Sequence, residues 1–477
     1  MALNHGVNTY KSETNFAAVK EAAVGIPFFV GAWPCHTTEK GFVDKPQLVT
    51  SYDEAVSLGG YSSEWRDSDG NPKWSLCQAI YSQFKLFCMT PAVVFNVYNP
   101  KQHKKAVEAT TFTVADHIVK LPYDVIKDES LVVKDDLEIL VLDTDYEVYY
   151  DGENCIIELL SDSTFYNATV LNIGYNVADL STITTATIEF AIEKIEMCMG
   201  LFGIVPDLIC CPGWSQNPSV AAVMAAKAPV INGLFKGKAV VDIDSSADGA
   251  SEYSEVLSWK NKNGYTSEDE IVCWPLVKVG DYLFDLSVIT CGLIAKVDEG
   301  NGDCPYESPS NKSLTITAAV NKAGEEISLN LQQADTISVS AGVVTVLNFN
   351  GWVLWGNYTG CWPASSDVSR YFTCCNRTMD WICNTFVLTY WSYVDKPLTR
   401  VLIDAICNSF NSWLNGLTHE NKLYGGEISY IADLNPVTNL IGGKFRLDTK
   451  MASPVPAQEI NMYCEYDVSI LENALNS

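Results

Sequence analysis

Short apolar runs and amphipathic stretches alternate along the first hundred residues of the chain. Residues 25–33 (GIPFFVGAW) are an apolar run bounded by glycine and proline, which is typical of a buried strand. Residues 74–87 have the apolar spacing of an amphipathic helix, and residues 91–100 (PAVVFNVYNP) are a second strand-like run between prolines. The order strand, helix, strand predicts a βαβ-like unit in a mixed α/β domain.

The pattern changes to short alternating strands between about residues 106 and 179. In residues 146–159 (YEVYYDGENCIIEL), Asp151 and Gly152 join two strand-like runs, which predicts a β-hairpin. After this β-rich stretch the α/β pattern returns, with expected elements at residues 184–203 (helix), 204–213 (strand), 217–228 (helix) and 238–244 (strand).

The second half of the chain is predicted to be strand-rich from residue 254 to residue 355, followed by an α+β region. Residues 399–417 have strong helical periodicity, and residues 440–468 supply two expected strands around a proline-rich joint. Residues 460–475 (INMYCEYDVSILENAL) have strand-like alternation without an obvious partner in the same domain. Extended termini of this kind can add as strands to the sheet edge of a neighbouring molecule.

At 477 residues the chain is too long for one ordinary core, so several domains are expected. The patterns predict a multidomain fold of the α/β and α+β classes with an inserted, β-sandwich-like domain. The expected parts are an N-terminal arm (1–20), a first part of the α/β core (21–105), an inserted outer β-rich domain (106–180), a second part of the core (181–355), a C-terminal α+β domain (356–458) and a C-terminal arm (459–477).

The formal net charge of −27 argues against a nucleic-acid binder, because affinity for phosphate backbones rests on Lys and Arg. The N-terminus lacks the pattern of a secretory signal, and no apolar segment approaches the length of a membrane helix. We therefore expect synthesis in a reducing cytoplasm and no membrane insertion.

Sixteen cysteines and five histidines are present, but no C-x-x-C pair and no zinc-ligand spacing occur. The adjacent pairs Cys210-Cys211 and Cys374-Cys375 lie in apolar or aromatic runs, which predicts buried free thiols. No metal or cofactor is expected.

Three segments are candidate catalytic motifs. Residues 233–239 (GLFKGKA) lack the spacing of a phosphate-binding loop, and residues 213–217 (GWSQN) lack the second glycine of a nucleophile elbow. Ser215 is interpreted as a helix cap. Asp242 and Asp244 at a strand end leave open an α/β hydrolase that uses one of them near Ser215, although no catalytic constellation stands out.

Residues 351–360 (GWVLWGNYTG) place large rings among glycines, which suits either a stacking platform for a ligand or a junction between domains. The second interpretation is preferred. Trp352 and Trp355 would clamp two domains across a turn, and Asn357 and Thr359 would bond the exposed backbone.

Three segments, taken in order, resemble the contractile tail sheath proteins of bacteriophages, tailocins and related injection systems. Residues 6–34 resemble the N-terminal arm and first core strand of the family. Residues 208–228 (LICCPGWSQNPSVAAVMAAKA) resemble a core segment in which a strand ends in Pro-Gly before a helix. Residues 351–360 contain the W-G-N-x-T signature at the entry to the C-terminal domain.

The resemblance implies a non-enzymatic subunit with a mixed-sheet core that stacks in helically related hexameric rings around an inner tube and contracts. Its implied partners are other copies of itself, the tube protein, and the baseplate and tail terminator proteins, in a virion tail or phage-like particle. The implied arm strands are at Val7, Thr9, Tyr10, Met462, Tyr463, Cys464, Glu465 and Tyr466. The implied tube contacts are His419, Asn421 and Lys422. A surface-array protein remains a further alternative.

Overall fold

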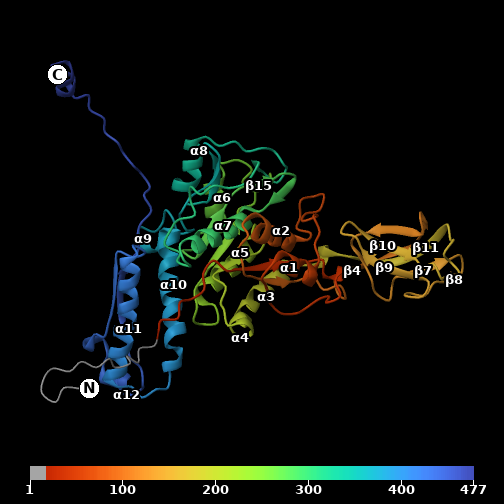
Figure 1. The fold of residues 1–477 in the computed structure, drawn as a ribbon, viewed down its shortest axis with the longest axis horizontal. Helices are drawn as coiled ribbons and strands as arrows, with labels where there is room; N and C mark the ends of the chain where they lie inside the picture. Colours follow the sequence, from red (N-terminus) through yellow and green to blue (C-terminus); the bar gives the residue numbers. More distant parts are fainter. Residues whose placement is uncertain (1–17, 477) are drawn as a thin grey trace, which may run out of the picture.

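A six-stranded mixed sheet lies at the centre of the molecule, between a β-rich body at one end and a helical body at the other (Figure 1). The computed structural model describes residues 18–476. Five of the strands are parallel, and β2 at one edge runs antiparallel to β3. In spatial order the strands are β14 (Glu270–Cys273), β13 (Lys238–Asp242), β12 (Leu208–Cys210), β1 (Pro27–Gly31), β3 (Ala92–Asn96) and β2 (Gln47–Val49).

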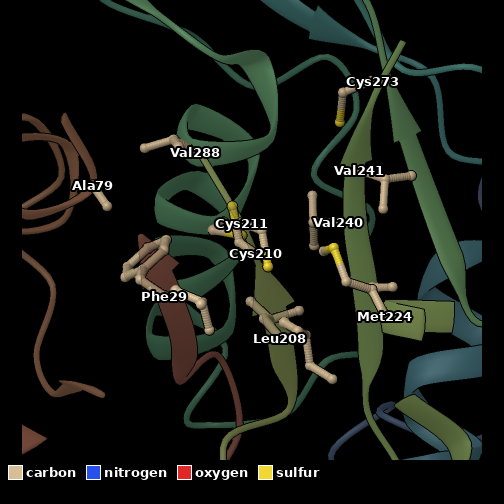
Figure 2. Close-up of a cluster of buried hydrophobic side chains, with 14 of the residues drawn as sticks. Phe29, Ala79, Leu208, Cys210, Cys211, Met224, Val240, Val241, Cys273 and Val288 are labelled. Carbon is tan, nitrogen blue, oxygen red and sulfur yellow. The ribbon is translucent and has the colours of Figure 1, made fainter. Parts of the chain in front are cut away.

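Parallel strands with helices on both faces are expected to be apolar, and the parallel strands of this sheet are apolar except at their ends, where Lys238, Asp242 and Glu270 lie. Figure 2 shows Phe29, Leu208, Cys210 and Val240, which come from three neighbouring strands, and all four are fully buried. The helices of the core are α1 (Tyr52–Gly59), α2 (Ser75–Tyr81), α3 (Thr185–Ile192), α4 (Cys198–Phe202), α5 (Pro218–Lys227), α6 (Val256–Asn263), α7 (Leu286–Gly300) and α8 (Leu331–Asp335). The mixed architecture agrees with the predicted fold class.

The 15-residue helix α7 lies where the sequence predicted a strand-rich region, and that expectation was wrong for this segment. The residues from Leu286 to Ala295 are all buried, so the helix has no polar face to reveal its period. It also contains β-branched residues such as Val288 and Ile289, which favour strands when read locally. Short strands do surround it: β15 (Leu276–Val279), β16 (Tyr282–Phe284), β17 (Ala318–Val320), β18 (Thr345–Asn348) and β19 (Trp352–Trp355).

The β-rich body, here called the insert, contains two antiparallel sheets that share one apolar core. Val119 and Ile157 from one sheet and Val133, Leu171 and Ile173 from the other belong to this core. Its strands are β4 (Lys104–Thr113), β5 (Ile118–Pro122), β6 (Val125–Ile126), β7 (Val132–Asp135), β8 (Glu138–Ile139), β9 (Tyr146–Tyr150), β10 (Asn154–Leu159) and β11 (Val170–Ala178). The antiparallel pairing of β9 with β10 confirms the predicted hairpin.

An aromatic cluster joins the insert to the core. The His36 ring lies between Trp74 and Tyr98 of the core and Tyr123 and Tyr150 of the insert, with ring centroids 5.5–6.0 Å apart. Burial lowers the pKa of His36 to about 4, so the imidazole is neutral at physiological pH. This packing fixes the insert against the core.

The helical body at the other end is built on two long helices, α10 (Thr373–Tyr390) and α11 (Arg400–His419). α11 confirms the helix predicted at residues 399–417. α10 was not predicted, because its many Thr, Asn and Cys residues are weak helix formers that tertiary packing must stabilise. The remaining elements are α9 (Val368–Tyr371), β20 (Gly425–Ser429), α12 (Val437–Ile441), β21 (Asp448–Ala452) and α13 (Val468–Asn476).

A buried ion cluster connects α10 to the core. The Arg377 guanidinium donates to Asp298 of α7, with N–O distances of 3.0 and 2.5 Å, and to Asp207 at 2.9 Å. All three side chains are nearly inaccessible to solvent. The helical body is therefore attached by paired charges as well as by apolar packing.

Candidate assembly surfaces

The helical body carries a two-stranded antiparallel sheet, β20–β21, in which Ile428 lies opposite Thr449. On the β20 side, the Asn411 side chain of α11 donates to the Ile428 carbonyl at 2.9 Å and accepts from its amide at 2.7 Å. On its other side, β21 has no strand partner among residues 18–476. The β21 edge can therefore accept one more strand.

The polypeptide after β21 runs along the body before it leaves it. Cys375 Sγ lies 3.5 Å from the Pro454 carbonyl, and the Gln458 side chain donates to Asn357 Oδ1 at 2.8 Å and accepts from the Tyr358 hydroxyl at 2.9 Å. The C-terminal end of the chain extends away from the molecule (Figure 1), and residues 459–476 are all exposed. Gln458 is thus the last anchor of the C-terminal segment.

The predicted arm strand lies in this free segment. Met462, Tyr463, Cys464, Glu465 and Tyr466 are all exposed and belong to no helix or strand. Their pairing with a neighbouring molecule stays a prediction, and Val7, Thr9 and Tyr10 lie outside the described residues. Two structural expectations were wrong. Residues 440–468 contain one strand, β21, where two were expected. Residues 468–476 form a helix, although their alternation is strand-like.

The chain that follows the N-terminal arm lies against the same helical body. The Ala22 amide donates to Thr385 Oγ1 at 3.0 Å, and the Trp381 indole donates to the Ala22 carbonyl at 3.0 Å. The Trp413 indole donates to Glu21 at 2.7 Å. Residues 20–22 are therefore fixed on α10 and α11, which brings both terminal segments to one body.

The GWVLWGNYTG segment begins in the β18–β19 hairpin. Trp352 packs on the core cluster, and the Trp355 indole donates to Asp335 of α8 at 3.1 Å. Both tryptophans therefore have contacts on the core side of the segment. Gly356 has φ 125°, and a side chain there would lie 3.0 Å from the Val343 carbonyl, so the turn requires glycine.

Contacts to the helical body come from the residues that follow Gly356. The Asn357 carbonyl accepts from the Thr373 amide at 2.9 Å, and Thr359 Oγ1 donates to the Arg370 carbonyl at 2.8 Å. Tyr358, which sequence reasoning passed over, stacks on Trp362, with ring centroids 4.6 Å apart. The sequence carries one signal for Tyr358: it is an aromatic residue between the two polar residues of an N-x-T string.

A clamp across the two bodies by Trp352 and Trp355 stays a prediction, and the contacts of Trp355 with the core predict a measurable loss of stability when its ring is removed. Trp355→Ala removes half-buried ring contacts and the hydrogen bond to Asp335, and should lower the free energy of unfolding by about 1–2 kcal/mol. Urea denaturation would measure the loss. Trp355→Phe, which keeps a ring, is the control and should lose less. Unchanged stability and unchanged assembly in Trp355→Ala would contradict the clamp.

The carboxyl ends of the central strands hold a buried polar network. Ser215 Oγ donates to Asp242 Oδ2 at 3.0 Å, and Ser287 donates from its hydroxyl at 2.5 Å and from its amide at 2.9 Å. Ser215 is not a helix cap, because Asn217 caps α5. Burial, followed by the nearby Asp285 charge, raises the pKa of Asp242 to about 7.

Within residues 18–476 we find no cluster of His, Cys, Asp and Glu side chains able to hold a metal ion. In the same part of the chain, every helix is too short or too polar to cross a bilayer. The thiols of both predicted pairs, Cys210-Cys211 and Cys374-Cys375, are buried and free.

Comparison with known proteins identifies relatives over the full length of the chain. The tail sheath protein of Burkholderia phage BcepMu is 26% identical over 98% of this chain and 97% of its own length. The tail sheath protein of Escherichia phage P2 is 24% identical over 45% of this chain and 53% of its own length. The chain is similar over its full length to contractile tail sheath proteins.

Solved structures show that the sheath fold extends over the whole chain. The helical sheath of the anti-feeding prophage in its contracted state matches with a TM-score of 0.57, at 13% identity, over 98% of this chain and all of that chain. The contracted sheath complex of the extracellular injection system PVC gives the same values. No family model matches the sequence.

The sheath relatives are structural proteins, which excludes the hydrolase alternative. The structure agrees, since Ser215 and Asp242 are inaccessible to a substrate and Asp244 bonds Ser246 of its own loop. The hydrogen bond between Ser215 and Asp242 belongs to the buried interior of the core.

The residues implied as tube contacts lie at the end of α11 and in the turn that follows it. His419 and Asn421 are exposed, and Asn421 has φ 59°. Lys422 is half-buried and ion-paired with Glu420 at 2.8 Å, which raises the pKa of Lys422. The charge of Lys422 is therefore already compensated within the chain, and the tube contact implied by the resemblance stays a prediction.

Proposed function

We propose that this chain is the sheath subunit of a contractile tail or phage-like injection particle. Copies would form hexameric rings that stack helically around an inner tube. Contraction of the stack would drive the tube through the envelope of a target cell. The observation that carries this proposal is an exposed, extended C-terminal segment on the same body as the open β21 edge.

Backbone pairing between copies suits such a polymer. An arm strand of one copy that adds to the β21 edge of the next makes a heterologous contact, and repetition of a heterologous contact builds rings or open helices. Flexible arms can change direction while their main-chain hydrogen bonds persist. Rigid bodies joined in this way can adopt two packings, extended and contracted.

The proposed partners follow from this architecture. They are neighbouring copies, an inner tube protein, and baseplate and tail terminator proteins at the two ends. Two supporting findings are that solved chains of the same fold come from a helical sheath and from a baseplate of the anti-feeding prophage. The mechanism needs no cofactor, since the energy of contraction would come from the difference between the two packings.

Electron microscopy of the purified protein tests the polymer. We expect helical tubes in negative stain, wider than a tail tube. Deletion of residues 1–15, or of the residues after Asn461, should abolish the tubes and leave the circular dichroism spectrum of the folded bodies intact. A monodisperse monomer at high concentration, with intact termini, would contradict the proposal.

Proline substitution tests the arm strand without a deletion. Met462→Pro and Tyr463→Pro each remove one amide, and adjacent amides point to opposite sides of a strand, so one of the two variants must lose a ladder bond. We expect that variant to lose tubes. Met462→Ala and Tyr463→Ala are matched controls that keep the amides and should assemble. Tubes from both proline variants would rule out pairing at these positions.

A further inference from the structure

A polar cleft lies at the carboxyl ends of the parallel strands β12, β13 and β14. Its walls include Trp214 from the loop after β12, Asp244 from the loop after β13 and Leu276 shortly after β14. Its volume is about 370 Å³, within the usual range of roughly 300–1,000 Å³ for ligand-binding clefts. In open α/β sheets, ligands bind outside the carboxyl ends of the strands. The cleft therefore has the usual ligand position of such a sheet, although sheath assembly and contraction make no use of it.

A buried carboxylate holds two side chains of the cleft in place. Asp285 is fully buried, and its Oδ1 accepts from Gln216 Nε2 at 2.7 Å and from the Arg66 guanidinium at 2.5 Å. Because a carboxylate only accepts hydrogen bonds, Gln216 must present its NH₂ group to Asp285. Gly213 brings two loops of the cleft together, since a side chain there would lie 2.7 Å from the Pro72 ring. The walls are therefore formed without a ligand.

Three buried polar atoms of the residues that line the cleft have no hydrogen-bond partner within residues 18–476. They are the indole nitrogen of Trp214, Oε1 of Gln216 and Nε of Arg66. Buried polar groups in folded proteins are nearly always hydrogen-bonded. Gln216 Oε1 accepts a hydrogen bond and the two nitrogens donate one, so the missing partner has to do both. A hydroxyl group meets this requirement.

The amide side chains of the cleft add both donors and acceptors. Asn263 donates through Nδ2 to a carbonyl of α6 at 2.9 Å, which leaves its oxygen for a ligand. Asn217 accepts through Oδ1 from an amide at the start of α5 at 3.0 Å, which leaves its NH₂ group. Lys322 and Asp244 line the cleft with opposite charges. An anion would need mainly donors and a metal ion mainly acceptors, so this mixture favours a neutral ligand that carries hydroxyl groups.

Two tryptophans, Trp214 and Trp259, line the same cleft. An indole combines a large apolar ring with one N–H group, which suits a ligand that has an apolar face and a polar edge. We propose that the cleft binds a neutral saccharide unit. Its hydroxyl groups bond the amide side chains, and its C–H face packs on a tryptophan. This binding goes beyond the proposed function and needs only one copy of the chain.

Saturation-transfer difference NMR on the full chain tests the cleft, with glucose, galactose, mannose and N-acetylglucosamine as probes. We expect transfer to at least one of the four sugars. Trp214→Ala and Asn263→Ala should each weaken binding of that sugar by about three- to tenfold, the effect of a lost hydrogen bond or ring contact. Trp391→Ala is the matched control, because Trp391 is 62% exposed and lies outside the cleft, in the turn between α10 and α11. That variant should bind as the wild type does.

Four results would overturn the proposal. Transfer to none of the sugars would leave the unpartnered atoms to water. Binding unchanged in both cleft variants, or weakened equally in Trp391→Ala, would place the sugar elsewhere. Glucose 6-phosphate bound several-fold more tightly than glucose would identify an anion site. If circular dichroism shows that Trp214→Ala is unfolded, Trp214→Phe replaces it, and binding unchanged in that variant would exclude the indole N–H as a contact. None of these measurements depends on tube formation, so a failure here is distinct from a failure of the sheath proposal.

Discussion

Arg377→Met is expected to lower the free energy of unfolding by about 3–5 kcal/mol, because it leaves buried carboxylates without their cation. Arg377 lies on α10 and is 4% exposed, and its two terminal nitrogens bond Asp298 and Asp207. Burial raises the pKa of Asp298 to about 6, so the carboxyl is ionised at pH 7.5. Methionine fills a similar volume but compensates neither negative charge.

The measurement is urea denaturation at pH 7.5, followed by tryptophan fluorescence. Trp381 lies one turn along α10 from Arg377 and reports on the same interface. Arg400→Met is the matched control, since Arg400 is 67% exposed and pairs with Asp404 four residues on along α11. That variant should lose less than about 0.5 kcal/mol. Equal losses in the two variants would show that the buried cluster does not hold the bodies together.

The elements that the sequence predicted correctly are those whose pattern is local. β1 and β3 are apolar runs between breakers, and α5 begins with Asn217 and Pro218, a cap and a first-turn proline. Helix α7 was missed because its residues from Leu286 to Ala295 are all buried, and α10 because its residues favour helix only in the packed protein. Burial and packing are properties of the fold, which a local pattern does not contain.

The assembly surfaces also include features that a local pattern predicts and features that only the fold brings together. An exposed C-terminal segment was predictable, since an alternating segment without a partner lay beyond the last domain, but the helix at its end was not. The contact of Gln458 with Asn357 and Tyr358 spans about a hundred residues, and no spacing rule could indicate it. An apolar pocket of the helical body was equally hidden, because its walls come from α10, α11 and both strands of the β20–β21 sheet.

Asp242→Asn is expected to stabilise the core increasingly as the pH rises from 5 to 8. The folded-state pKa of Asp242 is raised to about 7, above the ordinary value of 3.8. Between these two values the folded chain binds the proton more tightly than the unfolded chain, so stability falls as the pH rises. At about 1.4 kcal/mol per pH unit, the loss from pH 5 to pH 7 is about 2–3 kcal/mol and then levels off.

Asparagine removes this titration and can keep the hydrogen bonds, because its amide oxygen can accept from the Ser287 amide and its NH₂ can donate to the Ser287 or Ser215 hydroxyl. The difference in unfolding free energy between the variant and the wild type should therefore grow by about 2–3 kcal/mol from pH 5 to 8. Asp151→Asn is the control: backbone amides in the hairpin turn lower the pKa of Asp151, so that difference should stay constant. All other titrating groups are common to the variant and the wild type. If the difference in their unfolding free energies does not change from pH 5 to 8, Asp242 is already ionised in the folded core at pH 5.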